Sequence, residues 1–140
     1  MIILDTDHVS ILQWGDQPAE RLRNRLVEAI DGWIGTTAVT LEEQSRAIVT
    51  KLGQCKRTAD QPKYYSRLVS IYRFFGRWKF ADFDDDAAKQ FDVLRRSCKR
   101  VGRSHLKIAS IALVHDALLL TANVRDFEKV PGLRFENWLS

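Results

Sequence analysis

Three oxygen-bearing side chains stand at places where an α/β protein gathers its ligands. Asp5 ends the apolar run Ile2–Leu4, Asn123 follows a second apolar run at 117–121, and Glu43 lies near the start of a predicted helix. Carboxylate and amide oxygens are the ligands that hard divalent cations prefer. One or two such cations can ionise a water molecule and hold the leaving oxygen of a phosphodiester. Hydrolysis of a phosphodiester bond is therefore the chemistry that these residues suggest.

The elements that would position these residues are strands that alternate with helices. Apolar runs predict strands at 2–4, 33–37, 80–83, 117–121 and 133–135. Helical spacing of apolar residues predicts helices at 18–30, 40–52, 62–78, 87–101 and 104–115. This alternation is typical of an α/β fold with a mostly parallel sheet covered on both faces. In such a sheet, residues that leave neighbouring carboxyl ends converge in one crevice.

Two of the candidate residues also have a purely structural interpretation. Glu43 could close a capping box with Thr40, because a threonine followed three residues later by a glutamate is typical of a helix start. Asp5 could form a turn with Thr6 and Asp7 after the first strand. Spacing alone leaves both interpretations open.

Local signals predict where several helices begin and end. Gly53 should end the helix that starts at Thr40, and the polar segment 51–61 should be a mobile loop. The run Asp84–Asp86 should cap the next helix rather than bind a metal. Ser104 should cap the helix that follows Gly102.

The composition is that of one globular domain spanning 1–140. Hydrophobic residues make up 45% and charged residues 29%, and no apolar run is long enough to cross a membrane. The N-terminus lacks the basic start and apolar stretch of a secretion signal, so we expect a cytoplasmic protein. Cys55 and Cys98 form no CxxC pair and should be buried, reduced thiols.

A basic stripe could bind a nucleic acid. The net charge is +4, which favours anionic partners. Arg95, Lys99, Arg103 and Lys107 recur every four residues, flanked by Arg96 and Arg100, so a continuous helix would carry them on one face unless Gly102 breaks it. Such a face could follow an RNA backbone through Arg100, Arg103 and Lys107, or it could simply be a solvated surface.

Three segments resemble the PIN-domain family. MIILDTDHVS is similar to the LDT(N/D) opening of these domains, TTAVTLEEQSRA resembles their TxxTLxEL segment, and LKIASIALVHDALLLTANVRDFEKVPGLRFENW is similar to their C-terminal stretch. Within the family the match most resembles bacterial VapC-type toxins. That resemblance implies a three-layer α/β/α sandwich and a Mg²⁺- or Mn²⁺-dependent endoribonuclease.

The resemblance also assigns roles to single residues. Asp5 and Glu43 take the positions of the first two metal-binding acids, Asn123 takes the fourth, and Asp126 is a secondary candidate. The family places its third aspartate where this chain has His105. Imidazole is a poor ligand for Mg²⁺ but can bind Mn²⁺, iron or zinc.

His105 keeps more than one functional hypothesis open. The first is a metal-dependent endoribonuclease toxin, and the second is a catalytically impaired PIN domain that acts as a binding module. A DNA nuclease on the same scaffold is a third, because the metal mechanism does not require the 2′-hydroxyl of RNA. The resemblance further implies a homodimer that binds a small antitoxin, and the apolar residues of the 18–30 and 62–78 helices could supply the interfaces.

Overall fold

A sheet of parallel strands forms the centre of the computed structural model, which describes residues 1–29 and 32–139. Its order is β3-β2-β1-β4-β5, and every strand pairing among the described residues is parallel. The strands are β1 (Ile2–Leu4), β2 (Ile34–Thr37), β3 (Phe80–Ala81), β4 (Leu118–Leu120) and β5 (Arg134–Glu136). The predicted α/β architecture with a largely parallel sheet is therefore confirmed.

The order of the strands identifies the ligand-binding edge of the sheet. From β1 the chain proceeds through β2 to β3 on one side, and then crosses to add β4 and β5 on the other. The direction in which successive strands are added to the sheet reverses between β1 and β4. These two strands are parallel, and Ile2–Leu4 pair with Leu118–Leu120. In open α/β sheets, ligands bind beyond the carboxyl ends of the strands at this reversal. Asp5 and Thr121 leave the sheet there.

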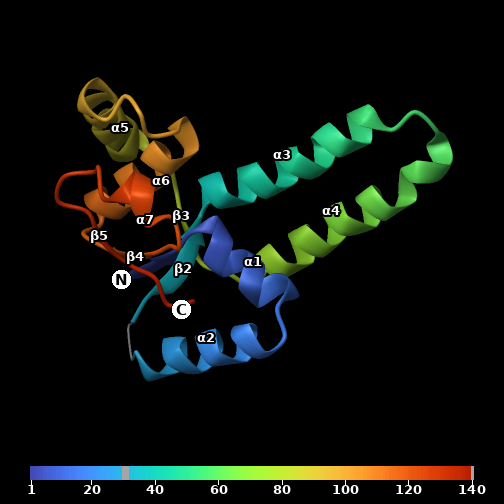
Figure 1. The fold of residues 1–140 in the computed structure, drawn as a ribbon, viewed down its shortest axis with the longest axis horizontal. Helices are drawn as coiled ribbons and strands as arrows, with labels where there is room; N and C mark the ends of the chain where they lie inside the picture. Colours follow the sequence, from blue (N-terminus) through green and yellow to red (C-terminus); the bar gives the residue numbers. More distant parts are fainter. Residues whose placement is uncertain (30–31, 140) are drawn as a thin grey trace.

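Helices cover both faces of the sheet (Figure 1). They are α1 (Thr6–Trp14), α2 (Gln17–Glu28), α3 (Ala38–Gln54), α4 (Pro62–Phe75), α5 (Asp85–Ser97), α6 (Arg103–Val114) and α7 (Val124–Phe127), with a 3₁₀ turn at Thr58–Asp60. Ile3 packs in one hydrophobic cluster with residues of α5, α6 and α7, whereas Ile2 and Leu4 pack in another with residues of α1, α2 and α4. Alternate strand residues thus bury opposite layers.

Helices α3 and α4 form a hairpin that extends away from the sheet (Figure 1). Thr37 caps α3, because its hydroxyl accepts a hydrogen bond of 3.1 Å from the backbone N–H of Thr40. The predicted capping box is therefore wrong, and Glu43 lies in the second turn. Helix α3 also continues past Gly53 to Gln54, so the expected loop at 51–61 is largely the tip of this hairpin.

The predicted basic stripe is divided between two helices. Helix α5 ends at Ser97, and Cys98 leaves the helical conformation with its thiol donating to the carbonyl of Lys129. Helix α6 then begins at Arg103 with Gly102 as its N-cap, so Ser104 is not the cap. Arg100 lies in the intervening turn. A single helical face from 95 to 107 does not exist.

Other predictions have mixed outcomes. Helix α1 was not predicted, because its first residues resemble a turn. Asp84 caps α5 as expected, through a 2.9 Å hydrogen bond from the N–H of Ala87. Cys98 is buried, but Cys55 is partly exposed at the tip of the hairpin, which corrects the expectation for that thiol.

The predicted end of α2 at Ile30 lies outside the described residues. No helix among the described residues has the length and apolar character needed to cross a membrane.

Candidate active site

Asp5 lies at the reversal point of the sheet, directly after β1. Its backbone N–H continues the ladder to the carbonyl of Leu120, and its side chain caps α1 by accepting from the N–H of Thr6 at 2.7 Å. The hydroxyl of Thr121, which follows β4, donates to its other oxygen at 2.8 Å. Asp5 is only 3% exposed. The site therefore has a buried carboxylate fixed from both central strands.

The electrostatic surroundings of Asp5 disfavour its ionised form. Burial raises the pKa of Asp5, and the nearby charge of Asp7 raises it further. The hydrogen bonds from Thr121 and Thr6 offset only part of this increase. An ionised Asp5 is thus destabilising in this position unless a cation compensates it.

Glu43 brings a second carboxylate to the same edge. It projects from the second turn of α3, and the hydroxyl of Thr6 donates to its Oε1 at 3.3 Å. Burial is the largest cause that raises the pKa of Glu43, and the negative charge of Asp5 is the second largest. The structure therefore brings Asp5 and Glu43 into one crevice, with Thr6 bonded to both.

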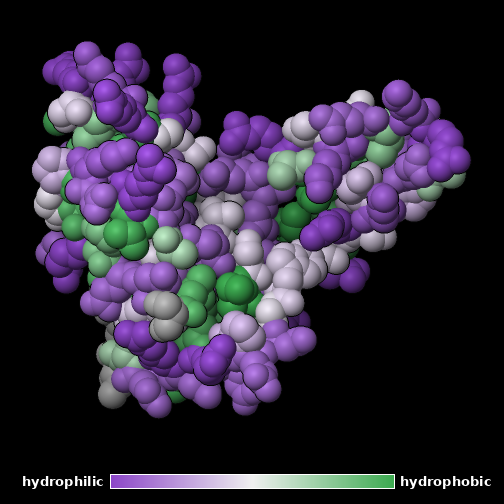
Figure 2. Space-filling view, in the orientation of Figure 1, coloured by the Kyte–Doolittle hydropathy of each residue, from purple (hydrophilic) through white to green (hydrophobic). Residues whose placement is uncertain are grey.

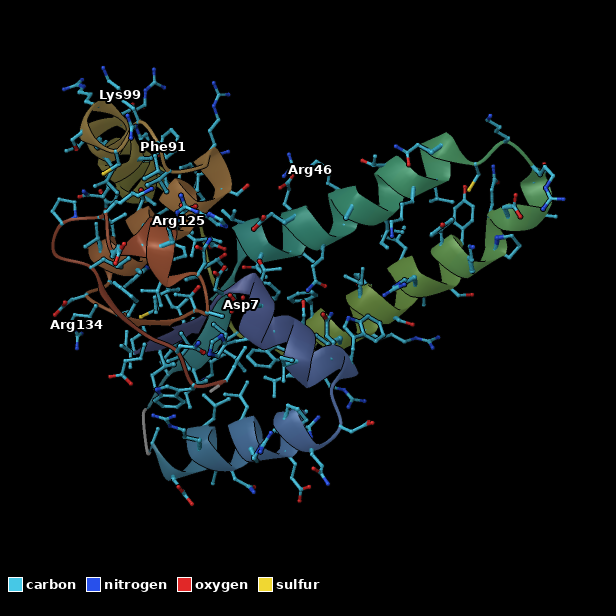
Figure 3. The ribbon with its side chains drawn as sticks, viewed as in Figure 1. Asp7, Arg46, Phe91, Lys99, Arg125 and Arg134 are labelled. Atoms are coloured by element: carbon cyan, nitrogen blue, oxygen red, sulfur yellow. The ribbon has the colours of Figure 1, made fainter. Side chains whose placement is uncertain are left out.

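Asp7 is a member of this cluster that the sequence did not single out. Its Oδ2 accepts from the N–H of Ala122 at 2.9 Å and lies 3.3 Å from the hydroxyl of Thr121. Burial alone would raise the pKa of Asp7, but hydrogen bonds from His8 and Ala122 outweigh burial and lower it. Figure 3 shows Asp7 at the centre of the molecule, at the N-terminal end of α1. Its position two residues after Asp5 was a usable signal, obscured because the segment resembles a turn.

His8 connects the crevice to the C-terminal segment. The ring is fully buried, its Nδ1–H donates to Asp7 at 2.6 Å, and its Nε2 accepts from the backbone N–H of Trp138 at 3.1 Å. With one nitrogen donating and the other accepting, His8 is a neutral imidazole. It has a structural role that its sequence position gave no sign of.

His105 lies on the opposite side of the crevice, in the first turn of α6. Its Nδ1 is 2.7 Å from Oδ2 of Asp126, and the side-chain amide of Asn123 lies 3.3 Å from the same nitrogen. Asn123 caps α7 by accepting from the N–H of Asp126 at 3.4 Å. The residues expected as the fourth and secondary metal ligands therefore contact His105 and each other.

His105 also acts on the carboxylate pair at a distance. The charge that its ring carries when protonated lowers the pKa of both Asp5 and Glu43, although less than burial raises them. When His105 donates Nδ1–H to Asp126, Nε2 is the nitrogen left to accept or to bind a cation. The His105 side chain is 32% exposed, so the ring is partly accessible to solvent.

The residues of the crevice fit a cation site with one or two carboxylate ligands better than a site formed by three or more side chains. Within 1–29 and 32–139, no three His, Cys, Asp or Glu side chains are arranged as a ready-made metal site. Magnesium in nucleic-acid enzymes, however, often binds through one or two carboxylates and keeps waters and substrate phosphates as its other ligands. The desolvated pair Asp5 and Glu43 meets that smaller requirement.

The three residues predicted to contact RNA do not lie together. Arg103 and Lys107 are one turn apart on α6, on either side of His105 in sequence. Arg100 lies in the turn before α6 and does not share their helix. Only Arg103 and Lys107 are therefore placed on the helix that also carries His105.

Comparisons with known proteins find relatives of this chain by sequence. No family model matches the chain. It is 32% identical over 69 residues to ribonuclease VapC2 of Rickettsia felis, which covers 46% of this chain and 52% of the relative. It is also 32% identical over 75 residues to the tRNA(fMet)-specific endonuclease VapC of Salmonella typhimurium, covering 51% of this chain and 57% of the relative. The matches thus span about half the length of these relatives.

The structural similarity extends over nearly the whole chain. The DNA-bound VapBC complex of Salmonella typhimurium contains a chain that superposes with a TM-score of 0.75, at 26% identity, covering 98% of this chain and 97% of that chain. The sheet and the helical layers that cover it therefore form a fold already known from a VapBC complex.

Proposed function

Because this chain is similar to VapC ribonucleases in sequence and to a chain of a VapBC complex in fold, we propose that it is a PIN-domain protein and a metal-dependent endoribonuclease toxin of a toxin–antitoxin pair. The reaction is hydrolysis of an RNA phosphodiester bond in the crevice beyond β1 and β4. Asp5 and Glu43 hold a Mg²⁺ or Mn²⁺ ion. Asn123 supports the site from the start of α7.

One observation carries this proposal. Asp5 and Glu43 are brought together at the reversal point of the sheet, and each has its pKa raised by burial and by the other acidic groups nearby. Such repulsion between desolvated carboxylates is relieved by a divalent cation. Neither residue has a salt bridge with a lysine or arginine among the described side chains.

Neighbouring residues of the chain hold the acids in place. Thr121 and Thr6 fix the two oxygens of Asp5, and Thr6 also contacts Glu43. Asp7 ties the start of α1 to the residues after β4 through Ala122. When bound, the cation would supply an activated water and stabilise charge on the leaving oxygen. The threonines and Asp7 act as positioning residues, since they orient the carboxylates rather than contact the substrate.

Cleavage of RNA by the purified protein tests the proposal. Substrates are a single-stranded RNA, an initiator tRNA and a DNA of the same sequence as the RNA, each titrated with Mg²⁺ and with Mn²⁺. The tRNA is included because one relative is named as a tRNA(fMet)-specific endonuclease. RNA cleavage that requires the metal and disappears in Asp5→Asn supports the proposal. Cleavage of DNA in preference to RNA contradicts it, and favours a DNA nuclease on the same scaffold.

A second function is favoured by the contact between His105 and Asp126. A protonated His105 near Asp5 and Glu43 would replace part of the charge that a cation supplies, which would leave a catalytically impaired domain that acts as a binding module. The two functions differ in their response to metal. An impaired domain cleaves no RNA with either cation, while it still binds its protein partner.

We further propose that the protein forms a homodimer and binds a small antitoxin in the cytoplasm. Large hydrophobic side chains are exposed on α2 and on the α3–α4 hairpin, among them Val27, Val49, Val69 and Tyr72. Figure 2 shows hydrophobic surface on the body above α2 and along the hairpin. Ultracentrifugation tests the dimer, and co-purification with the product of the adjacent gene tests the antitoxin. A strict monomer at high concentration contradicts the dimer.

A further inference from the structure

A groove between α3 and α6 adjoins the acidic crevice. It has a volume of about 460 Å³, and its lining includes Glu42, Arg46, Phe83, Arg103, Ser104 and Lys107. Glu43 directly follows Glu42, and His105 directly follows Ser104. The same two helices therefore supply the walls of the groove and two residues of the crevice.

The groove is cationic. Arg46, Arg103 and Lys107 face a single carboxylate, that of Glu42. Glu42 contacts Arg46 at 3.2 Å, but both side chains are more than half exposed, so this pair neutralises little. Arg103 has no ion pair within 1–29 and 32–139. A surplus of positive charge is thus available to an anion.

The side chains of the groove are also oriented by their surroundings. The ammonium group of Lys107 lies 5.7 Å from the centre of the Phe83 ring. Phe83 in turn packs edge-on against Phe91 at 6.2 Å. Figure 3 shows Arg46 projecting from α3, on the side from which α5 and α6 rise. The cations are therefore presented along one groove rather than scattered over the surface.

The negative charge of the crevice disfavours the approach of a substrate phosphate. A phosphodiester that enters the crevice approaches the carboxylates of Asp5, Asp7 and Glu43, which repel it. Arg46 and Glu43 are three residues apart on α3, which places them next to each other on the surface of that helix. A cationic groove beside the acids offsets the repulsion for the phosphates on either side of the reacting one.

We propose that the α3–α6 groove binds the RNA backbone next to the bond that is cleaved, with Arg46, Arg103 and Lys107 contacting phosphates. This inference rests on the proposed function and adds the path of the substrate. The groove has the volume of a small-ligand pocket, so it can hold a short single-stranded segment. Arg100, in the turn before α6, is not among the residues that line this groove.

Binding of RNA can be measured separately from cleavage. The parent protein is Asp5→Asn, which leaves a fluorescently labelled single-stranded RNA intact during an anisotropy titration. Arg103→Gln and Lys107→Gln are introduced into it, because glutamine keeps most of the stem of each side chain and removes the charge. Lys56→Gln at the tip of the hairpin is the matched control. Circular dichroism verifies that all variants fold.

The salt dependence gives the expected result. For single-stranded nucleic acids, the slope of log affinity against log salt concentration falls by about 0.7 for each phosphate contact that is lost. We expect a decrease of about this size for Arg103→Gln and for Lys107→Gln, and about twice as much for the double variant. Lys56→Gln should leave the slope unchanged.

Other outcomes overturn the inference in distinguishable ways. If the unmodified protein cleaves RNA while the groove variants bind like Lys56→Gln, the groove is not the path and the proposed function stands. If the unmodified protein neither binds nor cleaves RNA with either cation, both proposals fail. If the groove variants lose binding of an oligoglutamate peptide but keep RNA binding, the groove serves an acidic protein segment instead.

Discussion

On the β1 side of the crevice, Asp5 and Glu43 are held by hydroxyl and amide donors, and no lysine or arginine of residues 1–29 and 32–139 forms a salt bridge with them. On the α6 side, His105 and Asp126 are bonded to each other. Burial raises the pKa of both acids on the β1 side. On the α6 side the ring nitrogen and the carboxylate are 2.7 Å apart. The carboxylates on the β1 side would therefore gain from a nearby positive charge, while the carboxylate on the α6 side already has a histidine partner.

This difference indicates where a bound cation would stabilise the crevice most. A metal that relieves repulsion gains most beside Asp5 and Glu43, and gains less beside a carboxylate that already has a histidine partner. The contact between His105 and Asp126 also resembles the arrangement in which a carboxylate orients a metal-binding histidine. The α6 side can thus either compensate the crevice by itself or present Nε2 to a softer cation.

The largest expected effect is the loss of RNA cleavage in Asp5→Asn. The amide has the same shape but is a weaker cation ligand. Loss of a residue that only supports a metal ligand already costs about 10–100-fold in affinity or activity. We therefore expect cleavage to fall by roughly 100-fold or more, measured as the initial rate at saturating Mg²⁺ or Mn²⁺. Asp16→Asn, at an exposed helix start, is the matched control. Equal rates in Asp5→Asn and the unmodified protein would contradict the role of the β1 side.

The next largest effect concerns His105→Asp. This change gives the α6 side a third carboxylate and so increases the demand for a hard cation. We expect Mg²⁺-supported cleavage to rise by about 10-fold or more, the size of effect that a group supporting a metal site has. His115→Asp, at the exposed end of α6, is the control. Strong Mg²⁺-dependent cleavage by the unmodified protein that His105→Asp leaves unchanged would show that position 105 does not limit the site.

A smaller effect is expected for Asp126→Asn. The carboxylate of Asp126 lies 2.7 Å from Nδ1 of His105 and holds the orientation of the ring, which an amide would do less well. If Nε2 of His105 contributes to binding, Mn²⁺ affinity should fall by about 10-fold, measured by calorimetry without RNA. Asp116→Asn is a suitable control, because Asp116 is exposed and has a positive φ of 48° that asparagine tolerates. Unchanged Mn²⁺ affinity would mean that the α6 side only compensates charge.

The smallest effect is on stability. Because folding raises the pKa of Asp5, the folded state binds more protons than the unfolded state between the two pKa values, and stability falls as the pH rises through that range. At pH 7, Asp5→Asn removes this penalty and should melt a few degrees higher than the unmodified protein. The difference should narrow towards pH 4. A divalent cation should raise the melting temperature of the unmodified protein more than that of the variant.

The sequence was informative where a single strong rule applied. Asp5 and Glu43 could be placed together, because residues that leave parallel strands at a reversal point converge. The apolar runs that became β1 and β4 were short, but they ended at polar residues. The capping interpretation of Glu43 was wrong by one turn, since Thr37 already ends β2 and caps α3.

The pairing on the α6 side could not be predicted from the sequence. His105 and Asp126 are 21 positions apart, and Asp126 lies on α7, a helix of four residues. Hydrophobic periodicity needs a longer window to identify a helix. The basic stripe failed for a related reason, because spacing of four residues is meaningful only while one helix continues, and α5 ends at Ser97.

The hydrogen bond between Thr121 and Asp5 joins residues 116 positions apart, so it can form only late in the synthesis of the chain on the ribosome. Strand β1 is the centre of the sheet and lacks its β4 neighbour until residues 118–120 have emerged. At usual elongation rates that delay is on the order of ten seconds. A nascent chain therefore carries Asp5 long before it can assemble the crevice.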